Sequence, residues 1–88
     1  MTWTIEYSRD ADRFIQAEGI QREANRQIEG FLRKLLGESI NIDVKKLKGE
    51  WKGYFRIRKR RLRIIFSVDT SHRFIYVERV DFRGDAYK

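Results

Sequence analysis

The residues best suited to chemistry are the cations of one short segment. From position 45 to position 63, ten of the 19 residues are lysine or arginine, and only Glu50 is acidic. Aromatic and apolar residues recur between these cations at the spacing of a β-strand. Positive charge held on ordered strands needs a polyanion to neutralise it, and the phosphates of RNA or DNA are the foremost candidates.

Three arginines of this segment are expected to act together. Alternation places Arg56 and Arg58 on one face of a strand and Arg63 on the same face of the next strand. The planar fork of arginine binds phosphate through two hydrogen bonds, and a strand holds that fork more rigidly than a loop does. Arginine stays protonated near neutral pH, so it is a poor general base, but it can neutralise a phosphorane-like transition state.

A tyrosine near the C-terminus is a further candidate. Tyr87 follows Arg83 by four residues. If the tail folds over the arginines, the neighbouring cations would lower the pKa of the Tyr87 phenol from its ordinary value of about 10. The phenol could then accept a proton from a ribose 2′-hydroxyl or stack on a base. Alternatively, Tyr87 could pin the tail to the hydrophobic edge of the sheet.

Other catalytic equipment is missing from the sequence. The chain has no cysteine, and its single histidine, His72, falls in a predicted exposed turn. There is no glycine-rich phosphate loop and no spacing typical of metal ligands. We therefore expect neither a metal ion nor a cofactor.

Length and composition predict one small domain spanning residues 1–88, with a net charge of +7. No apolar run approaches the ~18 residues of a membrane span. The N-terminus also lacks the basic and then apolar layout of a signal peptide. We expect a cytoplasmic protein that does not bind membranes.

Local patterns predict the elements of the N-terminal half. Residues 2–7 alternate as a half-buried strand, with Trp3 in the core. Ser8 is the predicted N-cap of a short helix that ends at Gly19. A second helix ends at Gly37, and its apolar residues recur at helical spacing and are expected to face the core: Ile20, Ala24, Ile28, Phe31, Leu32, Leu35 and Leu36.

The C-terminal half is predicted to consist of strands. Residues 38–48 lack a pattern and are predicted to form a loop, and strands are predicted at 54–59, 62–69 and 73–80, with a turn at 69–72. In the last strand, Val80 is expected on the face opposite Val77. The order is β-α-α-β-β-β, an α+β fold with an antiparallel sheet and a two-helix hairpin on one face. The three arginines would then lie on the open face.

The remaining cations of the segment are expected to bind RNA phosphates without taking part in chemistry, and those at the hairpin tip could instead contact an acidic protein partner. They are Lys45, Lys46, Lys48, Lys52, Lys59, Arg60 and Arg61, of which the last three are predicted to form a hairpin tip. Trp51 is expected to cover the edge of the hydrophobic core, with base stacking as the alternative role.

The C-terminal half resembles the RelE/ParE toxin superfamily. The family pattern is L-x-G, then a strand with two basic residues around an aliphatic one, then a strand with an arginine before aliphatic residues, then a closing R-x-x-x-Y. The matching residues here are 47–49, 54–58, 62–66 and 83–88. The N-terminal strand and helices match by pattern alone.

The resemblance implies the toxin of a toxin–antitoxin pair. RelE-like members enter the ribosome and cut its mRNA without a metal ion, because the ribose 2′-hydroxyl attacks the adjacent phosphate and leaves a 2′,3′-cyclic phosphate. The implied partners are a small, acidic antitoxin and the ribosome with its mRNA and ribosomal RNA. The positions that match the family's catalytic residues are Arg56, Arg58, Arg63, Arg83 and Tyr87.

The chain departs from the family pattern at the paired basic positions and before the closing arginine. Arginines stand where lysines are typical, and Asp81 and Phe82 stand where relatives carry a basic residue or a histidine. The proton acceptor could therefore be Tyr87, Asp81 or Asp85. The alternatives to an mRNA endonuclease are a ParE-like inhibitor of DNA gyrase and an inactive module that binds nucleic acid or antitoxin.

Overall fold

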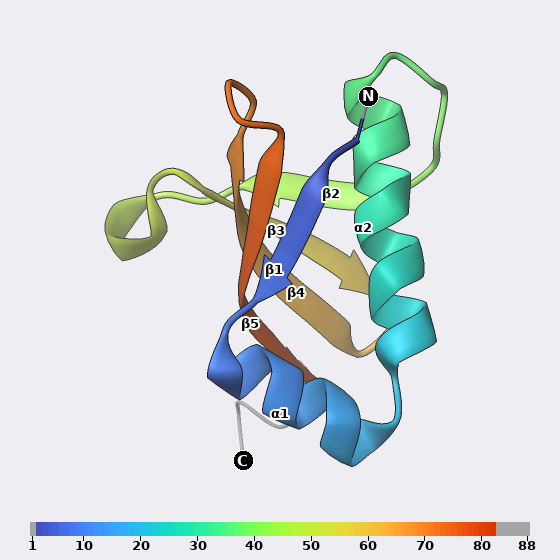
Figure 1. Cartoon of the computed structure of the whole chain (residues 1–88), viewed down its shortest axis with the longest axis vertical. Helices are drawn as coiled ribbons and strands as arrows, with labels where there is room; N and C mark the ends of the chain where they lie inside the picture. Colours follow the sequence, from blue (N-terminus) through green and yellow to red (C-terminus); the bar gives the residue numbers. More distant parts are fainter. Residues whose placement is uncertain (1, 83–88) are drawn as a thin grey trace.

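The computed structural model describes residues 2–82, which form two helices and a five-stranded sheet (Figure 1). The elements are β1 (Thr4–Tyr7), α1 (Arg9–Glu18), α2 (Gln21–Leu35), β2 (Asp43–Lys46), β3 (Tyr54–Lys59), β4 (Leu62–Asp69) and β5 (Phe74–Phe82). A short 3-10 turn, η1 (Gly49–Trp51), links β2 to β3. No helix in this part of the chain is long and apolar enough to cross a membrane.

The strand order is β1-β5-β4-β3-β2. Neighbours from β2 to β5 pair antiparallel, whereas β1 lies parallel to β5. One core joins both helices to one face of the sheet, with Ile15 and Ile28 packed above Ile57, Phe66 and Val77. The predicted α+β class and the two helices on one face are therefore confirmed, and the parallel strand at the edge makes the sheet mixed.

The predicted ends of α1 are confirmed. The Ser8 hydroxyl accepts a hydrogen bond from the Ala11 backbone N–H at 3.0 Å, as an N-cap does. Asp10 and Asp12 occupy the first turn, where the helix dipole favours negative charge. Gly19 ends the helix in the left-handed conformation, with φ 66°.

The apolar stripe of α2 extends beyond the core. Ala24, Ile28 and Phe31 are buried, and the Phe31 ring meets that of Phe66 at 4.8 Å. Leu35 and Leu36 are 44% and 68% exposed, so the prediction that they face the core is wrong. The last turn of α2 extends beyond the residues that pack on the sheet. Helical spacing predicts which residues share a face of the helix, but it does not predict where the sheet beneath that face ends.

Residues 38–48 contain a strand, so the prediction of a loop throughout this segment is wrong. β2 pairs with β3 and places Val44 opposite Ile57. Val44 packs against the core, whereas Asp43, Lys45 and Lys46 are exposed. Charged side chains are a usual feature of edge strands, and here they hide the alternation on which the strand prediction depends.

The predicted turn between β4 and β5 is confirmed. The Asp69 carboxylate accepts a hydrogen bond from the His72 backbone N–H at 3.2 Å and lies 2.8 Å from the imidazole Nδ1. These hydrogen bonds lower the pKa of Asp69 below its ordinary value. His72 is exposed, as predicted.

A β-bulge at Glu78 changes the register of β5. Phe66 pairs with Val77 and Ile65 with Arg79, so Glu78 is the extra residue. The bulge turns Val80 to the face that carries Val77, and the predicted opposite placement of these two valines is wrong. The Ser8 hydroxyl donates a hydrogen bond to the Glu78 carbonyl at 2.7 Å, so the start of α1 holds the bulge.

Candidate nucleic-acid interface

The face of the sheet opposite the helices carries the arginines that alternation predicts. Tyr54, Arg56 and Arg58 of β3 point away from the core, whereas Ile57 between them is fully buried. Arg63 of β4 lies directly opposite Arg58 on the neighbouring strand. We call the surface formed by Arg56, Arg58 and Arg63 the arginine face.

One row of the arginine face crosses four strands. From β2 to β5 it reads Asp43, Arg58, Arg63 and Asp81, with each residue opposite the next. Like charges directly opposite each other destabilise a sheet, and the two carboxylates at the ends of the row offset this repulsion. The row therefore holds two adjacent guanidinium groups that side-chain packing alone would not favour.

The two carboxylates hold their arginines differently. Asp81 binds Arg63 through two parallel contacts, Nε to Oδ1 at 2.9 Å and Nη2 to Oδ2 at 3.0 Å, and both side chains are largely buried. Asp43 makes a single contact to Arg56 Nη2 at 3.2 Å and is 57% exposed. Arg63 is thus fixed in orientation, and an incoming anion can displace Asp43 from Arg56 more easily.

Two donors of the arginine face have no hydrogen-bond acceptor within residues 2–82. The Nε atoms of Arg56 and Arg58 are both buried and unpaired. A buried donor without a partner costs about 1–3 kcal/mol, so such atoms are rare in folded proteins. Their Cα atoms lie two residues apart on one strand, a spacing of about 6.6 Å, and both side chains are on the same face. The arrangement suits a ligand with several negatively charged oxygens.

Aromatic residues border the arginine face. The Tyr54 hydroxyl lies 3.4 Å from Glu78 Oε1, and burial together with the Glu78 carboxylate raises the pKa of Tyr54 above its ordinary value. The Tyr54 phenol is therefore a poor proton acceptor near neutral pH. Trp51 packs edge-on against Tyr54 at 5.2 Å, with the Arg79 guanidinium 5.6 Å from its ring.

The prediction that Trp51 covers the edge of the core is wrong. Trp51 is half-buried but is absent from the side chains that pack on the core. Gly49 and Gly53 adopt positive φ angles on either side of it, so the chain folds back at η1. The indole lies instead against Tyr54 and Arg79, where contacts between aromatic rings and a cation hold it.

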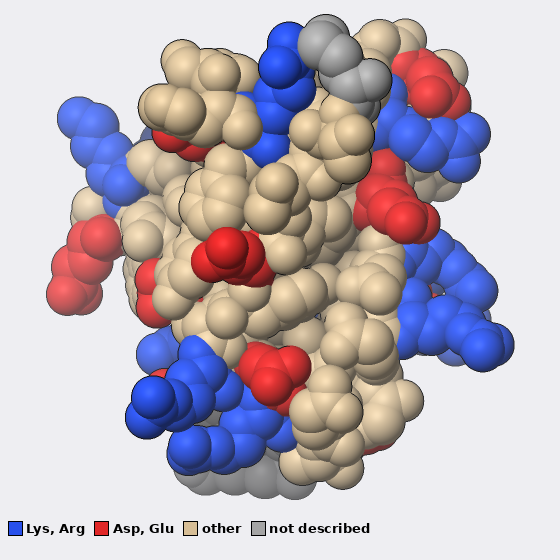
Figure 2. Space-filling model, viewed as in Figure 1, with Lys and Arg blue, Asp and Glu red and all other residues tan. Residues whose placement is uncertain are grey.

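The other predicted phosphate contacts are spread over several surfaces, and all are exposed. Lys45 lies opposite Arg56 on the arginine face, whereas Lys46 and Lys59 point to the helix side of the sheet. Figure 2 shows lysine and arginine side chains in separate groups around the outline of the molecule, including over α2. The turn between β3 and β4 is the predicted hairpin tip, formed by Arg60 and Arg61, and Arg61 lies 4.7 Å from the Phe82 ring.

Three predicted participants lie outside the described residues. Arg83, Asp85 and Tyr87 all follow Phe82, so their relation to the arginine face stays a prediction. Among residues 2–82 no group of three or more histidine, cysteine, aspartate or glutamate side chains is placed to hold a metal ion.

Sequence reasoning missed the carboxylates of the arginine face. Asp43 was placed in a loop, and Asp81 was weighed only as a proton acceptor. A regular hairpin would pair Arg63 with Val80, and only the bulge at Glu78 brings Asp81 opposite Arg63. The sequence shows that the two residues are acidic, but it does not show which residues of the neighbouring strands they lie opposite.

Solved structures with a similar fold include toxins from bacteria and archaea. A metal-bound toxin from Helicobacter pylori superposes with a TM-score of 0.70 at 17% identity, covering 96% of this chain and 98% of that one. One chain of the toxin–antitoxin complex RelBE2 from Mycobacterium tuberculosis gives 0.69 at 22% identity, covering 94% and 100%. One chain of the RelE–RelB complex from Pyrococcus horikoshii gives 0.61 at 24% identity, covering 96% and 98%.

Comparison of whole sequences does not find these relatives, whereas comparison of structures does. No protein-family model matches the chain, and no curated protein sequence matches it. The identities lie between 17% and 24%, and the superposed regions cover nearly the full length of both chains. The chain has the fold of the RelE-type toxins, as the resemblance of its sequence predicts.

Proposed function

We propose that this chain is the toxin of a toxin–antitoxin pair and that it cuts mRNA on the ribosome. The proposal rests on two buried Nε donors, those of Arg56 and Arg58, which have no hydrogen-bond acceptor among residues 2–82 and lie beside the fixed guanidinium of Arg63. A fold shared with toxins and a face built for phosphate together favour an endoribonuclease over a passive basic surface.

The proposed reaction is an internal transfer at one phosphate. The ribose 2′-oxygen loses its proton and forms a bond to phosphorus, and the bond from phosphorus to the 5′-oxygen breaks. The products are a 2′,3′-cyclic phosphate and a 5′-hydroxyl, which takes up a proton. Negative charge accumulates on the phosphate oxygens in the transition state, and the arginines neutralise that charge without a bound metal ion.

The residues would divide the work according to their positions. Arg56 and Arg58 would bind the two non-bridging oxygens of the scissile phosphate. The phosphate would displace the Asp43 carboxylate from Arg56. Arg63, fixed by Asp81, would stabilise the charge that develops during attack. Arg83 would assist the leaving oxygen, and Tyr87 would accept the proton of the 2′-hydroxyl or stack on a base.

An antitoxin is the second partner of this proposal. The structures of similar fold from Mycobacterium tuberculosis and Pyrococcus horikoshii were solved as complexes with antitoxins. A net charge of +7 favours an acidic partner that covers the cationic surfaces.

The test is brief induction of the chain in a bacterial host, followed by primer extension on an abundant mRNA. The proposal predicts cleavage inside translated codons that disappears when translation is blocked. Growth arrest with intact mRNA and an induced DNA-damage response would favour inhibition of gyrase instead. Absence of arrest, with folded protein present, would leave an inactive binding module.

A further inference from the structure

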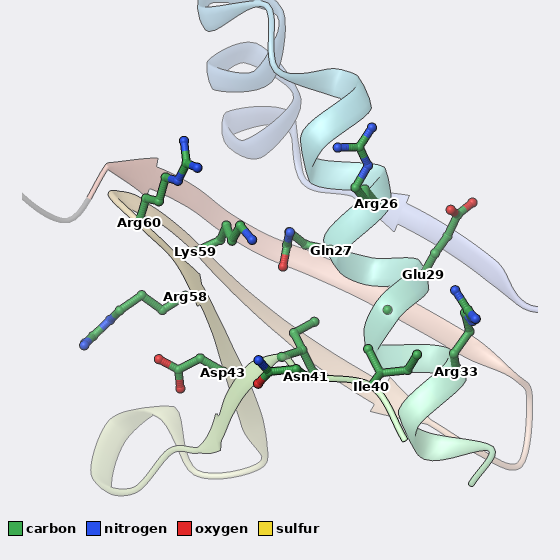
Figure 3. Close-up of a pocket in the computed structure, with 12 residues that line it drawn as sticks. Arg26, Gln27, Glu29, Arg33, Ile40, Asn41, Asp43, Arg58, Lys59 and Arg60 are labelled. Carbon is green, nitrogen blue, oxygen red and sulfur yellow. The ribbon is translucent and has the colours of Figure 1, made fainter. Parts of the chain in front are cut away.

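A cleft of about 430 Å³ separates α2 from the strands at the edge of the sheet (Figure 3). Gln27 and Gly30 line it from α2, Asn41 from the segment before β2, and Arg58, Lys59 and Arg60 from β3 and its hairpin tip. We call it the α2 cleft. Its size falls within the range of pockets that hold small ligands.

The α2 cleft is positively charged. Five cations and two carboxylates line it. Arg26 and Arg33 form ion pairs with Glu23 at 4.0 Å and Glu38 at 2.9 Å. Arg58, Lys59 and Arg60 have no ion-pair partner in the part of the chain that the structure describes. Lys59 and Arg60 are therefore available to an anionic ligand in the cleft, whereas the Arg58 side chain points away from α2 (Figure 3).

Amide side chains complete the walls of the cleft. Gln27 is only 8% exposed, and its side chain points from α2 towards Lys59 (Figure 3). Its Nε2 donates to Glu23 Oε2 at 2.8 Å, which fixes the orientation of the amide. Asn41 contributes a second amide from the opposite wall. Asparagine and glutamine amides match the donors and acceptors on the edges of nucleic-acid bases.

Arg60 stands at the tip of the β3–β4 hairpin. It adopts φ 57°, a left-handed conformation that tight hairpin turns require. Its side chain lines the α2 cleft next to Lys59.

Arg58 joins the α2 cleft to the arginine face. Arg58 borders the cleft at the edge of the sheet, but its side chain points away from α2, towards the arginine face, where it lies opposite Arg63 (Figure 3). Asp43 borders both surfaces. A single RNA strand with one phosphate at Arg56 and Arg58 would pass over this edge to reach the cleft. We propose that the α2 cleft binds the nucleotide next to the scissile phosphate. This proposal rests on the proposed function, because it assumes that the arginine face holds that phosphate.

The chemistry of the walls favours RNA over an acidic peptide. A peptide in a groove gains much of its affinity from large apolar side chains placed in pockets. The α2 cleft offers only Ile40 and Ile42 as apolar side chains, and its other side-chain walls are charged or amide groups. A nucleotide can use the charged groups and the amide groups at once, because its phosphate binds cations and its base hydrogen-bonds to amides.

The test is an NMR titration of the full chain with a 2′-O-methylated RNA tetranucleotide, which cannot be cut because the attacking hydroxyl is blocked. Binding should shift the side-chain amide signals of Gln27 and Asn41. Lys59→Gln should weaken binding at least about threefold and reduce the salt slope by about 0.7. Arg13→Gln removes one exposed charge from α1 and should leave the affinity within about 1.5-fold.

Other results of this titration would contradict either the cleft assignment or the proposed nuclease. Shifts confined to the arginine face, or equal losses in Lys59→Gln and Arg13→Gln, would overturn the cleft assignment while the proposed function stands. A tetraglutamate peptide that displaces the RNA from the cleft and binds more tightly would assign the cleft to a protein partner. Cleft binding by a wild-type chain that leaves ribosome-bound mRNA intact would support the cleft and contradict the proposed nuclease.

Discussion

The arginine face combines features that lower the stability of a folded chain. Arg58 and Arg63 lie directly opposite each other, and cross-strand pairs of like charge cost about 0.2–1 kcal/mol. The two buried Nε donors, which have no acceptor within the described part of the chain, cost more. A sequence selected only for folding would not keep these residues together. Residues that lower the stability of the fold are usual at functional surfaces.

The Arg63–Asp81 pair should contribute measurably to stability. Asp81→Asn removes charge from two contacts at 2.9 and 3.0 Å between partly buried groups, and we expect it to lower the free energy of unfolding by about 1–2 kcal/mol. Asp43→Asn is the matched control and should cost less than about 0.5 kcal/mol, because Asp43 is exposed. Urea unfolding measures the free energy of unfolding of both variants. Equal losses would contradict the claim that the Arg63–Asp81 pair stabilises the fold more than the Arg56–Asp43 pair.

Tyr54 should not act as the general base. Burial and Glu78 raise the pKa of Tyr54 above its ordinary value, so its phenol is protonated below that value, across the neutral range. Tyr54→Phe should therefore leave the pH dependence of cleavage unchanged between about pH 6 and 9. Tyr87→Phe should flatten the basic limb if Tyr87 accepts the proton. A flattened limb in Tyr54→Phe alone would reverse this assignment.

Among the secondary-structure elements, the bulge in β5 decides the composition of the arginine face. It brings Asp81 opposite Arg63 and at the same time returns Val80 to the core. The start of α1 supports it, because the Ser8 hydroxyl accepts from Ala11 and donates to the Glu78 carbonyl. One side chain thus caps a helix and fixes the register of a distant strand.

Ser8→Ala tests this double role. The substitution removes a helix cap and a donor to a backbone carbonyl, so it should cost about 1–3 kcal/mol in the free energy of unfolding. Ser71→Ala, in the exposed turn between β4 and β5, should cost less than about 0.5 kcal/mol. Differential scanning calorimetry of the two variants gives the comparison. Similar melting temperatures would show that Ser8 supports neither feature.

Local signals made some elements predictable from sequence and not others. The caps at Ser8 and Gly19 and the alternation in β3 and β4 lie within a few residues of the feature that they predict. β2 and the bulge at Glu78 depend on contacts with distant strands and with α1. The arginines were therefore predicted on the correct face, but the carboxylates that accompany them were not.

On the scale of the whole molecule, positive charge is arranged around a small core. The net charge of +7 does not form one uniform surface, since acidic side chains lie between the groups of cations (Figure 2). The arginine face and the α2 cleft both include Arg58 and Asp43 at the edge of the sheet. The proposed path of the RNA would run from one surface to the other across this edge.

The most direct test of the central claim is primer extension on ribosome-bound mRNA in a purified translation system, with wild-type chain and with Arg58→Gln. We predict cleavage within codons by the wild-type chain and a rate at least about 100-fold lower for Arg58→Gln, because a donor for the transition-state charge is lost. Arg13→Gln should cut at the wild-type rate. Intact mRNA with the wild-type chain, or equal cleavage by Arg58→Gln, would contradict the account.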